Sequence, residues 1–330
     1  MSSTDSTGWG VWLHAVRPVP ELAALSADAE ALGAAAILVA DEGTDRDLFV
    51  TLAAIAQRTR RILLFGAVTN PHSRHPVTTA AAFATLAELA PDRIVAGFGT
   101  GGSRVFGPLG LAPSRPYTAL VECLDIVQAL WRGETVEHTG ELTARGARLE
   151  WSPGSLPLAI AGRGPRVERL AAERADWVLL AGRAVETVPE LVGRLRSRGR
   201  AAIAWNPVTA WTDAMRDELR MHLAYMAVDM PASDRAALGL DADATSRLRS
   251  IVTTSGPEAA AQVITDAVLE RYAVVGTRAE VVTRLSELRA RVRPELLVFD
   301  AHDYSRAYGE EVAALALDVG ARAAHNGGAP

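Results

Sequence analysis

Short apolar runs alternate with amphipathic segments along the first 132 residues. Four runs are rich in aliphatic and aromatic residues, at positions 9–14, 37–40, 61–68 and 93–99. Each run is followed by a loop and then by a segment with helical spacing of its apolar residues, at 20–33, 47–59, 77–90 and 116–132. This alternation predicts a parallel sheet that is buried beneath its crossover helices.

The same rhythm returns after a polar segment with three turn glycines, residues 134–156, which we expect to form a hairpin. Further strands are expected at 158–161, 176–181, 201–204 and 295–300. Helices are expected at 165–174, 188–198, 277–291 and 305–322. Residues 212–271 are almost wholly helical in character, and we interpret them as an insertion together with the seventh barrel helix.

Eight strands with interleaved helices favour a TIM (β/α)8 barrel, an α/β fold, over an open doubly wound sheet. The open sheet usually has fewer strands and a glycine-rich first turn. We expect one domain over residues 1–330, with insertions near 104–115, 134–156 and 207–250, and a barrel that carries insertions at its carboxyl face. The active site of such a barrel lies at the carboxyl ends of the strands, so the residues after each strand are the first candidates for function.

Composition excludes several classes of protein. With 49% hydrophobic and 22% charged residues the chain is not intrinsically disordered. The formal net charge of −5 gives no basic footprint for nucleic acid or for an anionic membrane surface, so neither partner is expected. All 34 basic residues are arginine, which excludes a Schiff-base lysine and a P-loop lysine.

The single cysteine and the apolar runs bear on location. Cys123 has no second thiol for a disulfide and lies among aliphatic residues at helical spacing, so it is interpreted as a core residue. The longest apolar runs are far shorter than the roughly 20 residues that a membrane-spanning helix needs. We therefore expect a cytoplasmic protein.

Two glycine-containing loops could hold a ligand. The run Gly-Phe-Gly-Thr-Gly-Gly-Ser at 97–103 follows the fourth strand, where missing β-carbons would let backbone N–H groups approach a ligand. Spacing alone supports a plain turn equally well. The segment Ala-Gly-Arg-Gly-Pro at 161–165 precedes a helix, whose free N–H groups together with Arg163 predict a phosphate site. The alternative is an ordinary helix start with a solvated Arg163.

Ionisable residues also follow the early strands. His14 ends the first strand, and its near-neutral titration would suit proton transfer, although a histidine bonded to backbone is the commoner case. Acidic residues gather at 41–47 after the second strand. His72 and His75 lack the spacing of a helical metal pair and have no cysteine nearby, so no metal site is expected.

Taken together, five segments resemble the bacterial-luciferase-like superfamily of flavin and deazaflavin enzymes. The segments are residues 37–47, 68–76, 98–102, 130–134 and 161–165. Within the superfamily they are most similar to the methylenetetrahydromethanopterin-reductase-like branch, which uses coenzyme F420. The resemblance extends from about Gly10 to Asp303, and the order and spacing of the segments are more specific than any one of them.

The resemblance implies a TIM barrel with a hydride carrier lying across its carboxyl face. It implies a cis peptide between Ala67 and Val68, at a bulge in the third strand, that presses on the central ring of the cofactor. Gly162 to Gly164 and Gly182 would receive the phosphate. The residues that the resemblance places at the cofactor are Asp41, Ala67, Val68, Thr69, Asn70, Thr100, Gly101, Gly102, Ala161, Gly162, Arg163, Gly164 and Gly182.

The chain departs from its relatives at the usual proton donors. Glu42 and Gly102 stand where sugar-phosphate dehydrogenases of the superfamily have histidine and glutamate. Trp12 stands where the methanopterin reductases carry a glutamate on the first strand. The remaining candidates for catalysis are His14 and Glu42, and water is the alternative source of the proton.

These observations lead to a functional hypothesis with two alternatives. We expect an F420-dependent oxidoreductase that passes a hydride to or from a small organic substrate with a C=N or C=C bond. One alternative is an FMN-dependent monooxygenase that receives reduced flavin from a separate reductase. The other is a non-catalytic ligand-binding barrel. A homodimer is expected because the superfamily usually pairs through barrel helices.

Overall fold

Eight parallel strands close into a barrel in the computed structural model, which describes residues 7–302 and 304–320. The order around the barrel is β1, β2, β3, β4, β7, β8, β9 and β12, and β12 pairs again with β1. The predicted TIM barrel is therefore confirmed, as are its eight strands. Their bounds are β1 (Gly8–Leu13), β2 (Ala36–Val39), β3 (Leu63–Gly66), β4 (Ile94–Phe98), β7 (Leu158–Ala161), β8 (Trp177–Leu180), β9 (Ala202–Trp205) and β12 (Leu296–Asp300).

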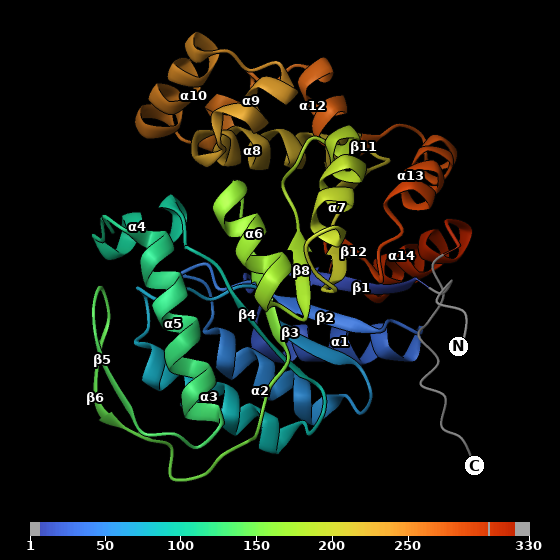
Figure 1. Ribbon diagram of the computed structural model, residues 1–330. Coiled ribbons are helices and arrows are strands. Elements are labelled where there is room, and N and C mark those ends of the chain that lie inside the picture. Colours follow the sequence, from blue (N-terminus) through green and yellow to red (C-terminus); the bar gives the residue numbers. More distant parts are fainter. Residues whose placement is uncertain (1–6, 303, 321–330) are drawn as a thin grey trace.

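Helices cover the outside of the barrel (Figure 1). Each of them matches a helix expected from the sequence to within a few residues. Their bounds are α1 (Val19–Ala31), α2 (Leu48–Arg58), α3 (Pro76–Leu89), α5 (Pro116–Trp131), α6 (Pro165–Arg174), α7 (Val188–Arg196), preceded by the 3-10 turn η1 (Val185–Thr187), α13 (Arg278–Val292) and α14 (Arg306–Asp318). The predicted end of the last helix, residues 321–322, lies outside the described residues.

Side chains alternate between the inside of the barrel and its helical coat. On β2, Ala36 and Leu38 join a small cluster inside the barrel, whereas Ile37 and Val39 join the larger cluster beneath the helices. Successive strand residues point to opposite faces, so every buried strand needs apolar residues on both. This is why the strands read as continuous apolar runs in the sequence.

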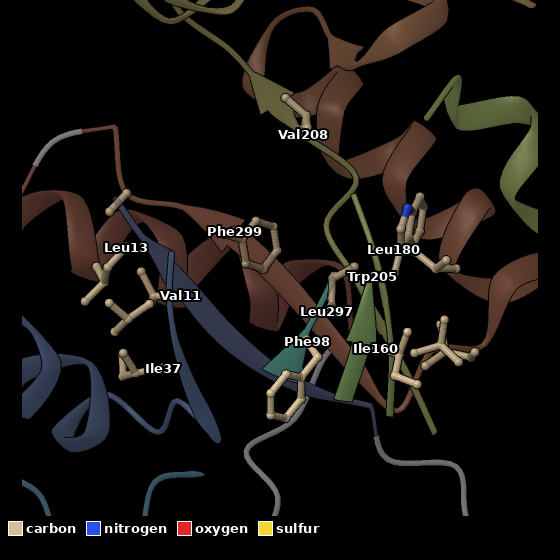
Figure 2. Packing of buried hydrophobic residues seen from close by; sticks show 14 of the residues in the cluster. Val11, Leu13, Ile37, Phe98, Ile160, Leu180, Trp205, Val208, Leu297 and Phe299 are labelled. Carbon is tan, nitrogen blue, oxygen red and sulfur yellow. The ribbon is translucent and has the colours of Figure 1, made fainter. Parts of the chain in front are cut away.

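The outer cluster is the main hydrophobic core. Figure 2 shows members of it from β1, β2 and β12, namely Val11, Ile37 and Phe299. Cys123 on α5 belongs to the same cluster and is fully buried, and this burial raises the pKa of its thiol to about 12. Its interpretation as a core residue is confirmed.

The polar segment after α5 forms the expected antiparallel hairpin of β5 (Val136–Thr139) and β6 (Thr143–Ala147). It belongs to the connection from α5 to β7, which enters β7 at the amino end of that strand. The hairpin lies along the outer helices (Figure 1). It contacts residues of the carboxyl rim, where the ring Nε2 of His75 donates to the carbonyl oxygen of Thr143 at 2.8 Å and Arg115 pairs with Glu141 at 3.1 Å.

The insertions at the carboxyl face are helical. The first contains α4 (Ser103–Leu109), a short helix that the sequence did not predict. The second runs from the end of β9 to the start of α13 and lies over the barrel (Figure 1). It consists of β10 (Thr209–Ala210), α8 (Asp213–Asp229), α9 (Ala232–Leu238), α10 (Ala242–Ser255), α11 (Pro257–Ala261), α12 (Asp266–Tyr272) and β11 (Val274–Val275).

This second insertion is longer than expected. The seventh barrel helix is α13, and the whole of 212–271 belongs to the insertion, which β10 closes by pairing with β11. Helical spacing shows that a helix has an apolar face but does not show whether that face packs on the barrel or on other helices. In residues 7–302 and 304–320 no helix combines the length and apolar character needed to cross a membrane.

Gly97 on β4 provides a test of a close contact between neighbouring barrel strands. A Cβ at this position would lie 1.9 Å from the carbonyl oxygen of Gly66 on β3. We expect Gly97→Ala to lower the free energy of unfolding by about 3 kcal/mol, because backbone has to move to admit the methyl group. Urea denaturation of the purified variant measures the change.

The matched control for that substitution is Gly193→Ala on α7. A Cβ there meets no atom within 4 Å, and the helix interior favours alanine over glycine. We expect a gain of about 0.5 to 1 kcal/mol in the free energy of unfolding. Equal stability of the two variants would contradict the packing described here.

Candidate active site

Two adjoining cavities lie where the carboxyl ends of the strands meet the helical insertion. Their volumes are about 810 Å³ and about 330 Å³. The two cavities share part of their walls, so a molecule in one would face a molecule in the other. The shared residues are Trp12, Glu42, Arg104, Ala181, His222, Tyr225 and Met226.

The smaller cavity is formed by the ends of β2, β3, β4 and β7, with a contribution from β8. Most of the sequence-predicted cofactor residues meet here: Asp41, Ala67, Val68, Thr100, Gly101, Gly102, Ala161, Gly162 and Arg163. The peptide between Ala67 and Val68 is cis, as the resemblance implied. Burial raises the pKa of the Asp41 carboxyl.

Gly99 allows the glycine run to lie close to Val68 at the cis peptide. A Cβ on Gly99 would lie 2.8 Å from Cγ2 of Val68, closer than such atoms approach in proteins. Any other residue at Gly99 would push Val68 or its own loop away from the cavity. Gly97 and Gly99 of the run are therefore required by their approach to residues 66–68, whatever else the run binds.

Three of the predicted cofactor residues do not line either cavity. Thr69 and Asn70 are buried beneath the rim, with exposed fractions of 0% and 2%. The Oδ1 of Asn70 accepts hydrogen bonds from the N–H groups of His72 and Ser73, each at 2.9 Å, so this side chain shapes the turn after β3. Gly164 is the residue before α6 and has a φ of +106°.

Arg163 places a cation without a partner at one end of the smaller cavity. Its Nη1 is buried and has no hydrogen-bond partner among the described residues, and burial lowers its pKa. The nearby Arg183 differs, because it pairs with Glu168 at 2.9 Å and with Asp234 at 3.3 Å. An anion is the kind of group that would satisfy Arg163.

Gly182 and Tyr272 lie close to Arg163 at this end of the site. Gly182, at the end of β8, has a φ of +67°, and a Cβ there would lie 2.9 Å from Cε of Met226 and 3.4 Å from Nη1 of Arg163. Gly182 lines the larger cavity. The hydroxyl of Tyr272, also on this wall, is buried and without a partner among the described residues.

The larger cavity is formed by the ends of β1, β8, β9 and β12. Trp12 and Asp300 are paired in the register of β1 and β12 and both line the cavity. Nδ2 of Asn206, after β9, donates to Oδ1 of Asp300 at 2.9 Å. The sequence-predicted His14 also lines this cavity, and its Nδ1 is buried without a partner among the described residues.

One face of α8 forms the opposite wall, and sequence analysis assigned no role to it. Glu218, His222 and Tyr225 are spaced three and four residues apart and line the larger cavity. A weak signal was present, since polar residues share this face with apolar Leu219 and Met226. Without the fold, nothing in the sequence said that this face turns toward the barrel.

Ion pairs and hydrogen bonds fasten the insertions to the rim. Glu42 is 2.7 Å from Nε of Arg104 on α4. Oδ2 of Asp229, the last residue of α8, accepts hydrogen bonds from the N–H and hydroxyl of Ser103, at 3.0 and 2.5 Å. The predicted catalytic Glu42 thus lies at the junction of the cavities with its carboxylate in an ion pair.

The chain has curated relatives of known activity. It is 28% identical over 266 residues to 5,10-methylenetetrahydromethanopterin reductase of Archaeoglobus fulgidus, covering 76% of this chain and 80% of the relative. It is 37% identical over 140 residues to F420-dependent glucose-6-phosphate dehydrogenase of Nakamurella multipartita, covering 40% of this chain and 41% of the relative.

A solved structure and a family model also match this chain. Coenzyme F420-dependent tetrahydromethanopterin reductase of Methanopyrus kandleri superposes with a TM-score of 0.80 at 20% identity, covering 93% of this chain and 97% of that one, which shows the shared fold. The family model described as luciferase-like monooxygenase matches residues 2–293. The protein therefore belongs to the luciferase-like monooxygenase family, and it is an oxidoreductase, as its sequence motifs predicted.

Proposed function

We propose that the protein is an F420-dependent oxidoreductase that transfers a hydride between the deazaflavin and a small organic substrate with a C=N or C=C bond. The F420-dependent activities named for its relatives support the choice of cofactor. The observation that carries the proposal is the partition of the rim into two adjoining cavities. One has a glycine-lined wall and an unpartnered arginine, and the other has room for a substrate.

The residues of the smaller cavity fit a phosphate-bearing, flat cofactor. Arg163 and the free N–H groups at the start of α6 would hold the phosphate, because both favour an anion at that end. The bulge at Ala67 and Val68 would lie against the ring system, with the glycine run on the neighbouring strand. Asp41 would stand beside the ring as a carboxyl whose pKa is raised by burial.

The bound cofactor would supply or accept the hydride. The chain's own residues position the substrate and manage its proton. Trp12 on β1 and residues of α8 line both cavities, and together they would limit the access of water to a substrate bound at the junction. His14 and Glu42 remain the sequence-predicted candidates for proton transfer, and Glu42 would have to leave its ion pair with Arg104 to take part.

The cofactor is tested by equilibrium titration of the purified protein with oxidised F420 and, separately, with FMN. We expect tight binding of F420 and weaker binding of FMN, measured by the change in cofactor fluorescence. Tight FMN binding, with oxygen consumption when reduced FMN is supplied and no affinity for F420, would establish the monooxygenase alternative. F420 binding without turnover of any electron acceptor would establish a ligand-binding barrel.

A second prediction concerns Arg163. We expect Arg163→Met to weaken F420 binding by about 10- to 100-fold, because a charge-assisted hydrogen bond to the phosphate is lost. The same variant should unfold at an equal or higher temperature than the parent protein without cofactor, because a buried cation without a partner is removed. Fluorescence titration and thermal unfolding measure the two effects.

The control for that variant is Arg198→Met, at an exposed arginine beyond the end of α7. It makes the same chemical change away from both cavities and should leave affinity and unfolding temperature unchanged. If Arg163→Met binds F420 as tightly as Arg198→Met does, the assignment of Arg163 to the phosphate is wrong.

A further inference from the structure

His222 lies at the place where a cofactor and a substrate would meet. It is on α8, and among the described residues it is the histidine that lines both cavities. The other histidines of the larger cavity, His14 and His302, do not line the smaller one. A group that exchanges a proton with the substrate at the moment of hydride transfer has to reach this junction.

His222 and His14 approach each other across the site. Their ring centroids are 6.2 Å apart, and the rings are inclined by 61° in an edge-to-face arrangement. His14 comes from the end of β1 and His222 from the helical insertion, so the pair joins the barrel to its cover. The Tyr304 hydroxyl fixes the backbone at His14 by donating to its carbonyl oxygen at 2.9 Å.

Burial, together with two neighbouring groups, favours the neutral form of His222. Burial, followed by the neighbouring His14, lowers the pKa of His222 to about 4. Asp300 on β12 and Glu218 on α8 act in the opposite direction, and Arg104 on α4 acts in the same direction as His14. At neutral pH the imidazole of His222 is therefore uncharged and able to accept a proton.

The other ionisable groups of the junction and of the larger cavity are engaged elsewhere. At the junction, burial raises the pKa of the Tyr225 hydroxyl, which hydrogen-bonds to Ser103. Glu42 is in an ion pair with Arg104 at 2.7 Å. His302 lies 2.9 Å from the carboxylate of Glu218. Burial raises the pKa of the Tyr272 hydroxyl far beyond the physiological range. His222 is thus the group at the junction whose ring is free to exchange a proton with a bound molecule.

We propose that His222 is the catalytic residue that exchanges a proton with the substrate during hydride transfer, and that His14 is its positioning residue. The proposal rests on the proposed function and adds the proton donor and acceptor to it. The substrate class is a small molecule whose hydride-accepting carbon is bonded to nitrogen or to a second unsaturated carbon.

The step is balanced in both directions. In oxidation, a C–H bond of the substrate breaks and its electron pair leaves with the hydrogen to oxidised F420, while the proton on the adjacent nitrogen or carbon passes to the neutral imidazole of His222. The C=N or C=C bond forms. In reduction, reduced F420 delivers the hydride to carbon, and the neutral ring of His222 donates its N–H proton to the adjacent atom while its other nitrogen takes up a proton from water.

Activity is tested with two probe substrates, 1-pyrroline for C=N and cyclohex-2-en-1-one for C=C, each with reduced F420. We expect His222→Gln to lower kcat by about 100-fold or more, in the range found for loss of a general acid or base, while the Kd for F420 stays unchanged. Added imidazole should restore part of the turnover of His222→Ala. The matched control is His138→Gln, on β5 and outside both cavities.

A measurement that needs no substrate is the NMR titration of the ring of His222 in the whole protein. We expect the ring to stay neutral down to about pH 4. His14→Gln should raise the pKa of His222, because His14 is one of the groups that lower it, and Asp300→Asn should lower it further. His138→Gln should leave it unchanged. This response would establish that His222 is coupled to His14 and Asp300, and the activity assays decide its proton role.

The outcomes separate the two proposals. If the protein does not bind F420, the proposed function fails, and the NMR titration still decides the pairing of His222 with His14. If F420 binds and the probes turn over equally in His222→Gln and His138→Gln, the proton role of His222 is wrong and the proposed function stands. If F420 binds and neither probe reacts, the substrate class is wrong. A ring that titrates in the ordinary histidine range, unaffected by His14→Gln, also overturns the proposal.

Discussion

The alternation of inward and outward side chains along eight short strands is the constraint on which the site depends. Each strand contributes to the inner cluster and to the core beneath the helices, and closure of the barrel fixes which residue comes last on the inner side. For β1 and β12 these last residues are Trp12 and Asp300, which the strand register sets side by side. The floor of the larger cavity is thus a consequence of how the barrel closes.

The rim divides along the strand order. The ends of β2, β3, β4 and β7 are consecutive around the barrel and carry the glycine run, the cis peptide between Ala67 and Val68, and Arg163. The ends of β8, β9, β12 and β1 are also consecutive and carry polar side chains with His14 among them. The half formed by β2, β3, β4 and β7 fits a flat, anionic molecule. The half formed by β8, β9, β12 and β1 fits a smaller molecule, and the helical insertion covers both halves.

Much of the fold was predictable from the sequence, because strands buried on both faces leave a strong signal. The cis peptide at Ala67 and Val68 was predictable only through the family resemblance, since no local residue type requires it. Thr69 and Asn70 follow a strand as site residues do, but both are buried beneath the rim, and the side chain of Asn70 binds its own loop. His222 was missed because its helix packs on the barrel through contacts distant in sequence, which periodicity does not reveal.

The hydrogen bonds between Asp229 and Ser103 connect α8 of the helical insertion to the loop that carries the glycine run. Ser103 directly follows the glycine run of the smaller cavity, and Asp229 ends the helix that walls the larger one. A displacement of the glycine run would therefore pull on the far end of α8 and tilt the wall of the neighbouring compartment. Because a coupling free energy between two sites is reciprocal, a molecule bound in either cavity would change the affinity of the other cavity by the same factor.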